Sequence, residues 1–278
     1  SIGDFIIMRA NGIPLYNFAV VVDDATMGIT HILRGEGHIP NTPVQILIYR
    51  ALGFPVPEIG HLGHMTNADR GKLSKRKGEA AIRDYREQGY LPEALMNFMS
   101  LLGWTPPGAE SGREFLTKEE LIRDFDIKRV TKAPSVFDRQ KLNWMNGVYI
   151  RRKSLEEFAE LALPFVVKDG IYTEEKARAN WEWFKEVLAQ VQERVETLAE
   201  VPEHVDFFLK DEISMDEAAA AKFLTEAVKP FFRREVEALR TVEWNVEAIE
   251  KAIRSIQEEM GLKPKESFQP TRVAITGR

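Results

Sequence analysis

The chain has 278 residues, 44% of them hydrophobic and 29% charged, which is an ordinary globular composition long enough for two or more domains. Its formal charge of −5 excludes a global field that would attract nucleic acid or an anionic membrane, so any polyanion must be met by local patches. The lack of cysteine excludes disulfides and thiolate metal sites, no apolar run reaches membrane-spanning length, and the five histidines lack metal-ligand spacing. We therefore expect a cytoplasmic protein with no protein-built metal site and no membrane contact.

Residues 1–66 alternate between apolar runs and turn signals. The runs FIIMR and FAVVV are β-branched and bounded by Asn-Gly and Asp-Asp pairs, and THILRG is a third short apolar run, so all three are predicted strands. In NTPVQILIYRALG, Thr42 is a suitable N-cap, Pro43 follows at the first helical position, and Gly53 comes after the last turn. This order of strand, loop and helix predicts an α/β fold, in which ligands lie at strand ends.

Residues 67–150 have a mixed pattern. A basic stretch, RGKLSKRKG, leads into a helix expected around AIRDYREQG. LPEALMNFMSLLGW predicts a second helix that starts near Pro92 and ends before Gly103. Residues 105–113 are rich in proline and glycine and predict a loop.

From residue 151 onward the pattern is helical. Apolar residues between positions 177 and 198 advance by alternating steps of four and three, which predicts one long helix. A second stripe runs from Ile249 to Met260 and ends at Gly261. Such stripes form the core of a helical bundle more often than a cofactor site. Two pairs have capping-box spacing, Ser154 with Glu157 and Ser214 with Glu217.

The stretch RGKLSKRK places five basic side chains in eight positions of an acidic protein. A solvated turn explains most such runs, because surface lysines are common. Here glycines at positions 71 and 78 give the stretch freedom to move, and lysines on a moving loop can close on a phosphate during a reaction. The order Lys-Leu-Ser-Lys-Arg is also similar to Lys-Met-Ser-Lys-Ser, the second ATP motif of class I aminoacyl-tRNA synthetases, whose glutamyl branch often carries Lys-Leu-Ser-Lys-Arg.

Longer stretches carry the same resemblance in the same order. YNFAVVVDDATMGITHILRGEGHIPNTPVQILIYRALG precedes the motif, and YREQGYLPEALMNFMSLLGW, FDRQKLNWMNGVYIR, EHVDFFL and FQPTRVAITGR follow it. The chain resembles the C-terminal portion of bacterial glutamyl-tRNA synthetases, without the first half of the catalytic domain and its His-Ile-Gly-His motif. His61-Leu62-Gly63-His64 is no substitute, because it directly precedes the lysine motif, where the family has a strand. The helical C-terminal half separates the chain from glutaminyl and archaeal-type glutamyl enzymes, which carry β-barrels there, and from the short glutamyl-queuosine paralogues, which lack the region.

The resemblance implies a fold that is α/β and then mostly α, in three domains. Residues 1–66 would be the C-terminal half of a Rossmann-type catalytic domain, residues 67–150 a stem-contact domain with the KLSKR loop, and residues 151–278 a helical anticodon-binding domain. The implied activity is that of a monomeric glutamate-tRNA ligase, which uses ATP and Mg²⁺ to form glutamyl-adenylate and transfers glutamate to tRNA(Glu). This segment alone is expected to be inactive. Two alternatives remain open: a non-catalytic tRNA-binding module, and a glutaminyl-specific or relaxed enzyme.

The resemblance also assigns residues to the nucleotide. Lys72 and Lys75 would be catalytic, since they would stabilise the charge that builds on the β- and γ-phosphates as pyrophosphate leaves, by about 3 kcal/mol per contact. The backbone around Leu62 and Met65 lies where the family holds adenine. The expected ATP-binding set is His38, Leu62, Met65, Lys72, Ser74 and Lys75.

Arg34 and Tyr16 match positions that bind the substrate glutamate, with Arg34 facing its side-chain carboxylate. A planar guanidinium can bind a carboxylate through two parallel charge-assisted hydrogen bonds. A neutral glutamine side chain would offset the desolvation of the guanidinium less well, which disfavours its binding. From the residues alone, Arg34 could instead pair with Asp23, Asp24 or Glu36, and Tyr16 could be a half-buried core residue. The aspartate pair is interpreted as a turn and loop anchor. The chain departs from the family at RGEGH, where the fourth residue is usually aspartate.

A basic segment follows the mixed region. Residues 128–153 hold eight basic side chains and one acidic one, a net charge of +7, which suits contact with a phosphate backbone and predicts binding that weakens with salt. A solvated basic face is the alternative. Trp144, in the apolar run LNWM, is expected in the core and not as a platform for base stacking, and Arg233 with Arg234 are weaker candidates for contact with the anticodon arm. The expected tRNA-binding set is Lys128, Arg129, Lys132, Arg139, Lys141, Arg151 and Arg152.

Overall fold

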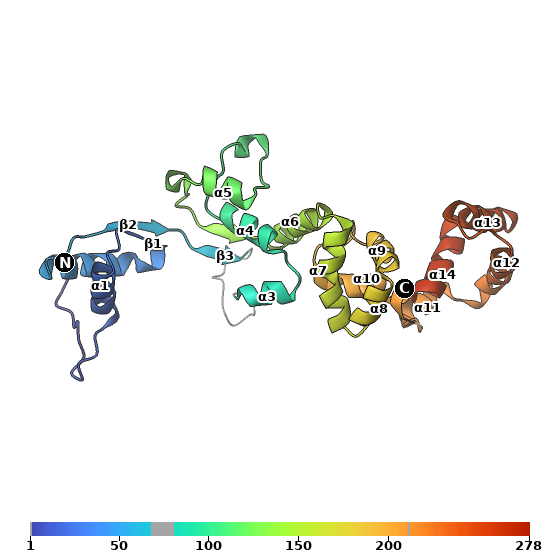
Figure 1. The fold of residues 1–278 in the computed structure, drawn as a ribbon, viewed down its shortest axis with the longest axis horizontal. Helices are drawn as coiled ribbons and strands as arrows, with labels where there is room; N and C mark the ends of the chain where they lie inside the picture. Colours follow the sequence, from blue (N-terminus) through green and yellow to red (C-terminus); the bar gives the residue numbers. More distant parts are fainter. Residues whose placement is uncertain (1, 68–80, 211) are drawn as a thin grey trace. The chain divides into compact units, whose positions relative to one another are not determined.

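The computed structural model describes residues 2–67, 81–210 and 212–278, which form two compact units, residues 1–149 and residues 150–278 (Figure 1). The division falls inside α6 (Arg139–Arg151). The three-part domain division expected from the sequence stays a prediction. In the described part of the chain, no helix combines the length and the apolarity that crossing a membrane requires.

The first unit contains four short strands and six helices among the described residues. Its helices are α1 (Tyr16–Thr26), α2 (Thr42–Ala51), α3 (Ile82–Glu87), α4 (Pro92–Leu101), α5 (Lys118–Asp124) and α6. Its strands are β1 (His31–Gly35), β2 (Glu58–Leu62), β3 (Met65–Asn67) and β4 (Ser135–Phe137). Three 3₁₀ turns connect these elements, η1 (Glu36–Asn41), η3 (Ala109–Ser111) and η4 (Ile127–Arg129).

The first unit begins with an α/β arrangement. β1 pairs with β2 in parallel, and α2 lies in the connection between the two strands. α1 packs against α2 around a core of Val21, Ile48 and Tyr49. Buried Gln45, on α2, donates to Asn17 Oδ1, on α1, at 2.9 Å. The predicted strand in THILRG and the predicted helix in TPVQILIYRA are therefore confirmed, as is the α/β class of this region.

Two strand predictions near the N-terminus are wrong. FAVVV lies inside α1, because Phe18, Val21 and Ala25 recur at a helical spacing and face α2. Packing against α2 thus outweighs the β preference of the valines. FIIMR forms no strand, and Met8 makes only an isolated bridge to Pro14.

The helices that follow the basic stretch match their predictions. α3 and α4 occupy AIRDYREQG and LPEALMNFMSLLGW, and they pack with α6 around Tyr85, Tyr90, Phe98, Leu142 and Met145. β3 and β4 form a second parallel pair, with Met65 opposite Ser135. The predicted loop at 105–113 is confirmed apart from the single turn η3.

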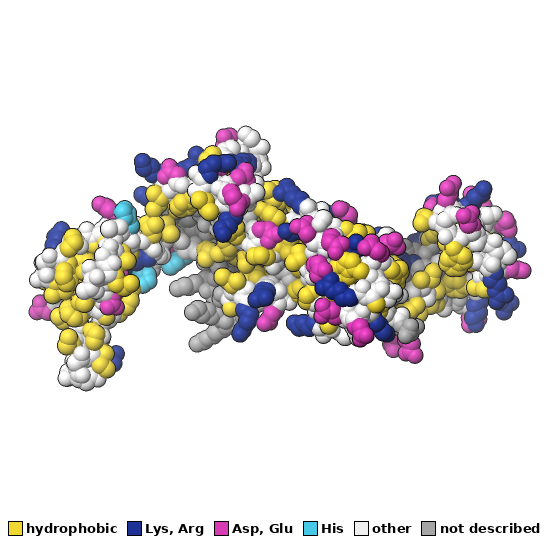
Figure 2. Space-filling model, viewed as in Figure 1, with side chains coloured by type: hydrophobic (Ala, Val, Ile, Leu, Met, Phe, Trp, Pro, Cys, Tyr) yellow, Lys and Arg dark blue, Asp and Glu magenta, His cyan; other side chains and the backbone are white. Residues whose placement is uncertain are grey.

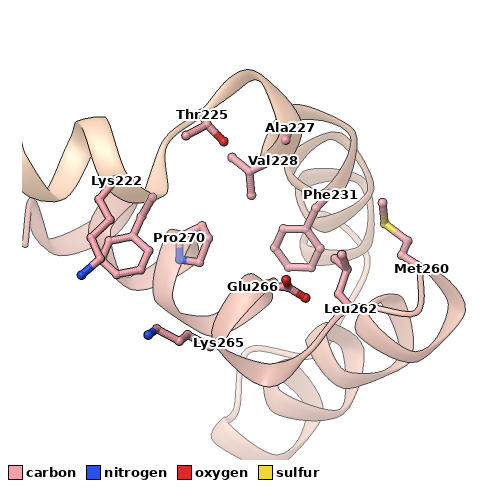
Figure 3. A pocket seen from close by; sticks show the side chains of 11 residues that line it. Lys222, Thr225, Ala227, Val228, Phe231, Met260, Leu262, Lys265, Glu266 and Pro270 are labelled. Atoms are coloured by element: carbon pink, nitrogen blue, oxygen red, sulfur yellow. The ribbon is translucent and has the colours of Figure 1, made fainter.

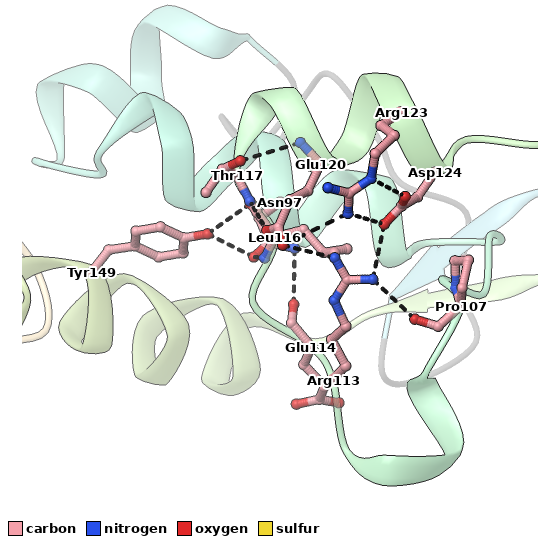
Figure 4. Close-up of polar contacts among 10 residues, drawn as sticks. All are labelled: Asn97, Pro107, Arg113, Glu114, Leu116, Thr117, Glu120, Arg123, Asp124 and Tyr149. Carbon is pink, nitrogen blue, oxygen red and sulfur yellow. Dashed lines mark hydrogen bonds and ion pairs between the residues drawn. The ribbon is translucent and has the colours of Figure 1, made fainter.

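A polar network ties the segment 113–124 to α4 and α6 (Figure 4). Fully buried Asn97 donates to the carbonyl of Glu114 at 3.0 Å and accepts from the backbone N–H of Leu116 at 3.0 Å. The Tyr149 hydroxyl lies 2.7 Å from Asn97 Oδ1. Arg113 makes ion pairs of 2.8 Å with both Glu120 and Asp124, and hydrogen bonds from arginine side chains lower the pKa of Asp124 to about 2.

The second unit is helical throughout the described residues. One group of packed helices comprises α7 (Leu155–Lys168), α8 (Glu174–Ala179), α9 (Trp181–Ala189) and α10 (Val201–Leu209), with the turn η5 (Leu198–Glu200). Another group comprises α11 (Glu217–Phe223), η6 (Glu226–Val228), α12 (Lys229–Leu239), α13 (Val246–Glu259) and α14 (Pro264–Thr276). The predicted helical bundle is confirmed.

Two details of the second unit differ from the prediction. The apolar stripe over 177–198 is buried apart from the half-buried Trp181, but it is not one helix, because Asn180 leaves the helical conformation (φ −124°, ψ 43°) and α9 ends at Ala189. The predicted capping box at Ser154 and Glu157 is present. The second one is wrong, since Asp216, and not Ser214, caps α11.

Candidate active site at the carboxyl ends of two parallel strands

The carboxyl ends of β1 and β2 bring together residues that are far apart in the sequence. Arg34, near the end of β1, lies opposite His61 on β2 in the strand register. The turn η1 follows β1 directly and carries Glu36 and His38, and α2 begins at Thr42. This edge is where ligands bind in open α/β sheets.

Arg34 is held by a hydroxyl and not by a carboxylate. Its Nη2 donates to Thr42 Oγ1 at 2.8 Å, and its Nε is buried with no hydrogen-bond partner. Among the described residues no ion pair joins Arg34 to Asp23, Asp24 or Glu36, so the internal salt bridge considered above is absent from this part of the chain. The guanidinium therefore keeps hydrogens available for an anionic group.

Tyr16 and His38 contact each other and are connected to this arginine through Thr42. The Tyr16 hydroxyl and the Asn41 side-chain nitrogen are each 3.5 Å from Nδ1 of His38, and the carbonyl of His38 accepts from Thr42 at 3.1 Å. Tyr16 is 54% exposed, so the alternative of a half-buried core tyrosine is wrong. Three residues predicted from the sequence, Tyr16, Arg34 and His38, are thus joined through Thr42 in one connected set.

The sequence pattern missed two parts of this site. Thr42 was expected to cap α2, but Asn41 occupies the N-cap position, and the Thr42 hydroxyl contacts Arg34 and, at 2.9 Å, Nε2 of His61. His61 was considered only as part of a rejected motif. Pairing the two strand ends in register would have identified it, since residues opposite each other in a sheet share a face.

Glu36 and His64 lie close to the glycine in RGEGH. Glu36 Oε1 accepts from the backbone N–H of His64 at 3.2 Å and lies 3.9 Å from its Nε2. A side chain at position 37 would place its Cβ only 3.3 Å from Cε1 of His64. A larger residue at position 37 would therefore require the His64 imidazole to shift by a few tenths of an ångström.

Leu62 and Met65 line a cavity of about 520 Å³ next to the strand ends. Gly35, Gly63 and Trp104 also line it. A Cβ at Gly63 would lie 2.7 Å from the carbonyl oxygen of Ala133, so only glycine lets the two backbones approach this closely. The walls are mostly apolar, as a binding site for a flat heterocycle requires.

The lysine motif itself lies outside the described residues. This applies to Lys72, Ser74 and Lys75, for which no contact can be given. Within residues 2–67, 81–210 and 212–278, no group of three or more His, Asp or Glu side chains is arranged to hold a metal ion.

Several basic residues of the predicted tRNA-binding set have structural partners. Arg129 donates to the carbonyls of Thr105 and Pro106, at 2.8 and 3.1 Å. Lys141 forms a 2.6 Å ion pair with Glu114. Arg139 lies over the rings of two tyrosines of α3 and its following turn and contacts Gln88. Lys128, Lys132 and Arg152 are exposed and Arg151 is half-buried.

The expectation that Trp144 belongs to the core is wrong. Its side chain is 44% exposed on α6, and one face packs against Phe115, with ring centroids 5.5 Å apart. The apolar run LNWM predicted burial of Trp144, but of its apolar residues only Leu142 and Met145 face inward on the helix. Trp144 thus presents part of its aromatic surface to solvent.

Besides an open cavity of about 520 Å³ along α12, two further cavities of the second unit have basic side chains in their walls. One, of about 400 Å³, is lined by apolar residues of α12 and its neighbours, including Val228, Phe231 and Leu262, with Lys222 and Lys265 at its edge (Figure 3). The other, of about 270 Å³, is lined by aromatic and basic side chains. Its lining includes Arg194, His204, Phe207, Phe208, Arg272 and Arg278.

Arg278 is held by Asp206 and by the carbonyl of Glu203. Arg194 and Arg272 are exposed, and no ion pair with either was found in the described part of the chain. Figure 2 shows that elsewhere on the visible face of this unit basic and acidic side chains are interspersed. A pair of arginines beside aromatic rings is therefore a local concentration of binding groups.

Comparison with known proteins identifies both units. A family model described as "tRNA synthetases class I (E and Q), catalytic domain" matches residues 1–144, and one described as "Anticodon binding domain" matches residues 157–278. The glutamate–tRNA ligase of Symbiobacterium thermophilum is 84% identical over all of this chain, and that of Aquifex aeolicus is 46% identical over 99% of it. The chain spans 58% and 57%, respectively, of the length of these two relatives.

A solved structure agrees with these matches. The crystal structure of a glutamate tRNA ligase from Elizabethkingia meningosepticum, in complex with its amino acid, superposes with a TM-score of 0.78 at 27% identity. The match covers 100% of this chain and 57% of that one. The resemblance stated from the sequence motifs is confirmed, because the catalytic-domain model alone covers more than half of the chain. Residues 1–278 therefore belong to the class I tRNA synthetase family, E and Q.

Proposed function

We propose that these residues serve a glutamate–tRNA ligase, which activates glutamate with ATP and transfers it to tRNA(Glu). The observation that carries the proposal is Arg34. It lies at a parallel strand end, one of its nitrogens is buried without a partner, and no ion pair with it occurs among the described residues. A carboxylate at this point could accept hydrogen bonds from the Nη hydrogens that Thr42 leaves unpaired.

The proposed roles follow the geometry of the strand ends. Arg34 binds the side-chain carboxylate of glutamate, and exposed Tyr16, within 3.5 Å of His38, supplies a hydroxyl beside it. A neutral amide would offer the guanidinium one acceptor in place of a charged pair, which disfavours glutamine. His38, which contacts Tyr16 and Thr42, is proposed to bind ATP.

ATP is proposed to bind with its base near the backbone of Leu62 and Met65, where the apolar cavity of about 520 Å³ supports the assignment. Lys72, Ser74 and Lys75 would meet the phosphates, an assignment that rests on the motif. Mg²⁺ commonly binds through substrate phosphates and water with few protein ligands. A protein-built metal site in the described residues is therefore not required.

The tRNA is proposed to contact the exposed basic residues of segment 128–153 and the second unit. In that unit the support is the cavity lined by Arg194, Arg272 and aromatic rings, since arginine and aromatic side chains together bind phosphate and unstacked bases. The proposal places the enzyme in the cytoplasm, as a monomer, with tRNA, glutamate, ATP and Mg²⁺ as its partners.

A single substitution tests the catalytic assignment. In a protein with the full length of the curated relatives, ATP–pyrophosphate exchange is measured with glutamate and tRNA present, for the native protein and for Lys75→Ala. We expect exchange to fall about a hundredfold, because one contact to the developing phosphate charge is lost. Exchange at the native rate in the variant would show that the lysine motif is not the phosphate site.

The chain taken by itself supports a second candidate, a non-catalytic tRNA-binding module. The observation in its favour is that residues 1–278 contain no His-Ile-Gly-His sequence and span 58% of the length of the most similar curated relative reported above. Filter binding of tRNA across a salt series, run beside an adenylate assay on the same chain, separates the two. The module would bind tRNA with a salt-dependent affinity and form no adenylate.

A further inference from the structure

The hydroxyl of Thr42 lies where three polar groups of the strand-end site meet. Arg34 Nη2, from β1, is 2.8 Å from Oγ1, and His61 Nε2, from β2, is 2.9 Å from it. The carbonyl of His38, from η1, is 3.1 Å away. One side chain at the first position of α2 therefore connects both strands and the turn between them.

Counting hydrogens determines the direction of these bonds. A hydroxyl has one hydrogen to donate and two lone pairs that accept. Arg34 can only donate and the carbonyl of His38 can only accept. All three contacts are satisfied together only when Thr42 donates to His38 and accepts from both Arg34 and His61, so Nε2 of His61 carries a hydrogen.

We propose that Thr42, supported by His61, is a positioning residue that orients Arg34 toward the carboxylate of the substrate. This inference rests on the proposed role of Arg34 in binding glutamate. The Thr42 contact fixes one Nη, and the buried Nε has no partner of its own, so the hydroxyl is the one hydrogen-bond partner of this guanidinium found among the described residues.

Orientation matters because the guanidinium is a planar fork. A functional group must be held within about 0.5 Å and 10–20° of its productive geometry, and an arginine side chain loses much rotamer entropy when it is fixed. A hydroxyl that already accepts from His61 and donates to His38 cannot rotate away without breaking both bonds. Thr42 thus orders Arg34 before the substrate binds, so that less of the binding free energy is lost to that ordering.

The kinetic test compares Thr42→Val, which removes the hydroxyl at nearly constant volume, with Thr42→Ser, which keeps it. Both are made in a protein of the relatives' full length and assayed by ATP–pyrophosphate exchange with glutamate and tRNA. We expect Thr42→Val to raise the KM for glutamate about tenfold while kcat and the KM for ATP change less than about twofold. Thr42→Ser should stay within about twofold of the native KM.

Other outcomes of that assay overturn the inference. An unchanged KM for glutamate in Thr42→Val would show that Arg34 does not depend on the hydroxyl. A fall in kcat together with an equal rise in the KM for ATP would show general damage to the site. The effect would then not be specific to Arg34, contrary to the inference. An equal rise of the KM for glutamate in Thr42→Ser and in Thr42→Val would show that keeping the hydroxyl does not preserve the site, which contradicts the positioning role.

A second measurement does not depend on activity. In the 278-residue chain, the Nε–H resonance of Arg34 is assigned by its loss in Arg34→Lys, and its exchange with water is followed by NMR. We expect slow exchange in the native chain and in Thr42→Ser, and fast exchange in Thr42→Val. Equal exchange in all three contradicts the positioning role. If native protein lacks glutamate-dependent exchange of pyrophosphate while this pattern holds, the proposed function fails and the positioning of Arg34 stands.

Discussion

Replacing Asn97 by alanine is expected to destabilise the first unit by about 3 kcal/mol. Asn97 is completely buried, and its amide satisfies the backbone N–H of Leu116 and the carbonyl of Glu114, both at 3.0 Å (Figure 4). Each buried polar group left unsatisfied costs about 1–3 kcal/mol. The Tyr149 hydroxyl contributes little to the loss, because it also lies 3.1 Å from the carbonyl of Leu116 and keeps that acceptor.

The estimate assigns about 2 kcal/mol to the N–H of Leu116, a residue that is 2% exposed, and about 1 kcal/mol to the carbonyl of the partly exposed Glu114. This is a large share of the roughly 5–15 kcal/mol that stabilises a domain. The assay is urea unfolding combined with hydrogen exchange at the Leu116 amide. Ser100→Ala, on the same helix, is the control, because it removes one local bond, from Ser100 Oγ to the Asn97 carbonyl at 2.7 Å.

Ser100→Ala should cost less than about 1 kcal/mol and leave exchange at Leu116 slow. If Asn97→Ala destabilises no more than this control, the network in Figure 4 is not a source of stability. If the loss of stability appears without faster exchange at Leu116, the buried N–H is satisfied in another way and the bond-by-bond estimate is wrong.

Two further predictions concern the second unit. The double variant Arg194→Ala/Arg272→Ala should weaken tRNA binding about tenfold and lower the slope of log affinity against log salt by about 2. The control is Arg254→Ala, which should change neither quantity, because the Arg254 guanidinium is paired with Glu250. Filter binding over a salt series measures both quantities, and equal slopes for the double variant and the control would argue against this surface. Burial raises the pKa of Glu235, and the hydrogen bond from Thr271 opposes this shift more weakly. The contribution of Glu235 to stability is therefore complete below the usual carboxyl pKa of 4.5 and is lost as the pH rises through the raised pKa. Glu235→Gln should therefore make the second unit more stable at pH 7 and flatten the pH dependence of its urea midpoint, and an unchanged pH profile would contradict the raised pKa.

The parts of the fold that could be predicted from sequence are those in which local pattern and packing agree. THILRG became β1, and the helix after Pro43 became α2, because strand preference, capping residues and burial point the same way in each. FAVVV could not be predicted, since its β preference is local whereas the face of α2 that it covers is distant in sequence. The break in the helix at Asn180 could likewise not be predicted, because the spacing of apolar residues continues through it.

The candidate site divides in the same way. Arg34, Tyr16 and His38 were identified by family motifs, and they do lie in one connected set. The contribution of Thr42 and His61 depends on the register of two strands joined by a crossover, which no local pattern encodes. Thr42 was assigned a capping role because threonine before proline is a common helix start, while its hydroxyl is occupied by the site.

The most direct test of the account compares two amino acids at Arg34. ATP–pyrophosphate exchange is measured with glutamate and with glutamine, in a protein of the relatives' full length, for the native sequence and for Arg34→Gln. The account predicts that the native protein prefers glutamate on the order of a hundredfold and that the substitution removes most of this preference. An unchanged preference for glutamate in Arg34→Gln would contradict it, because the carboxylate would then be recognised elsewhere.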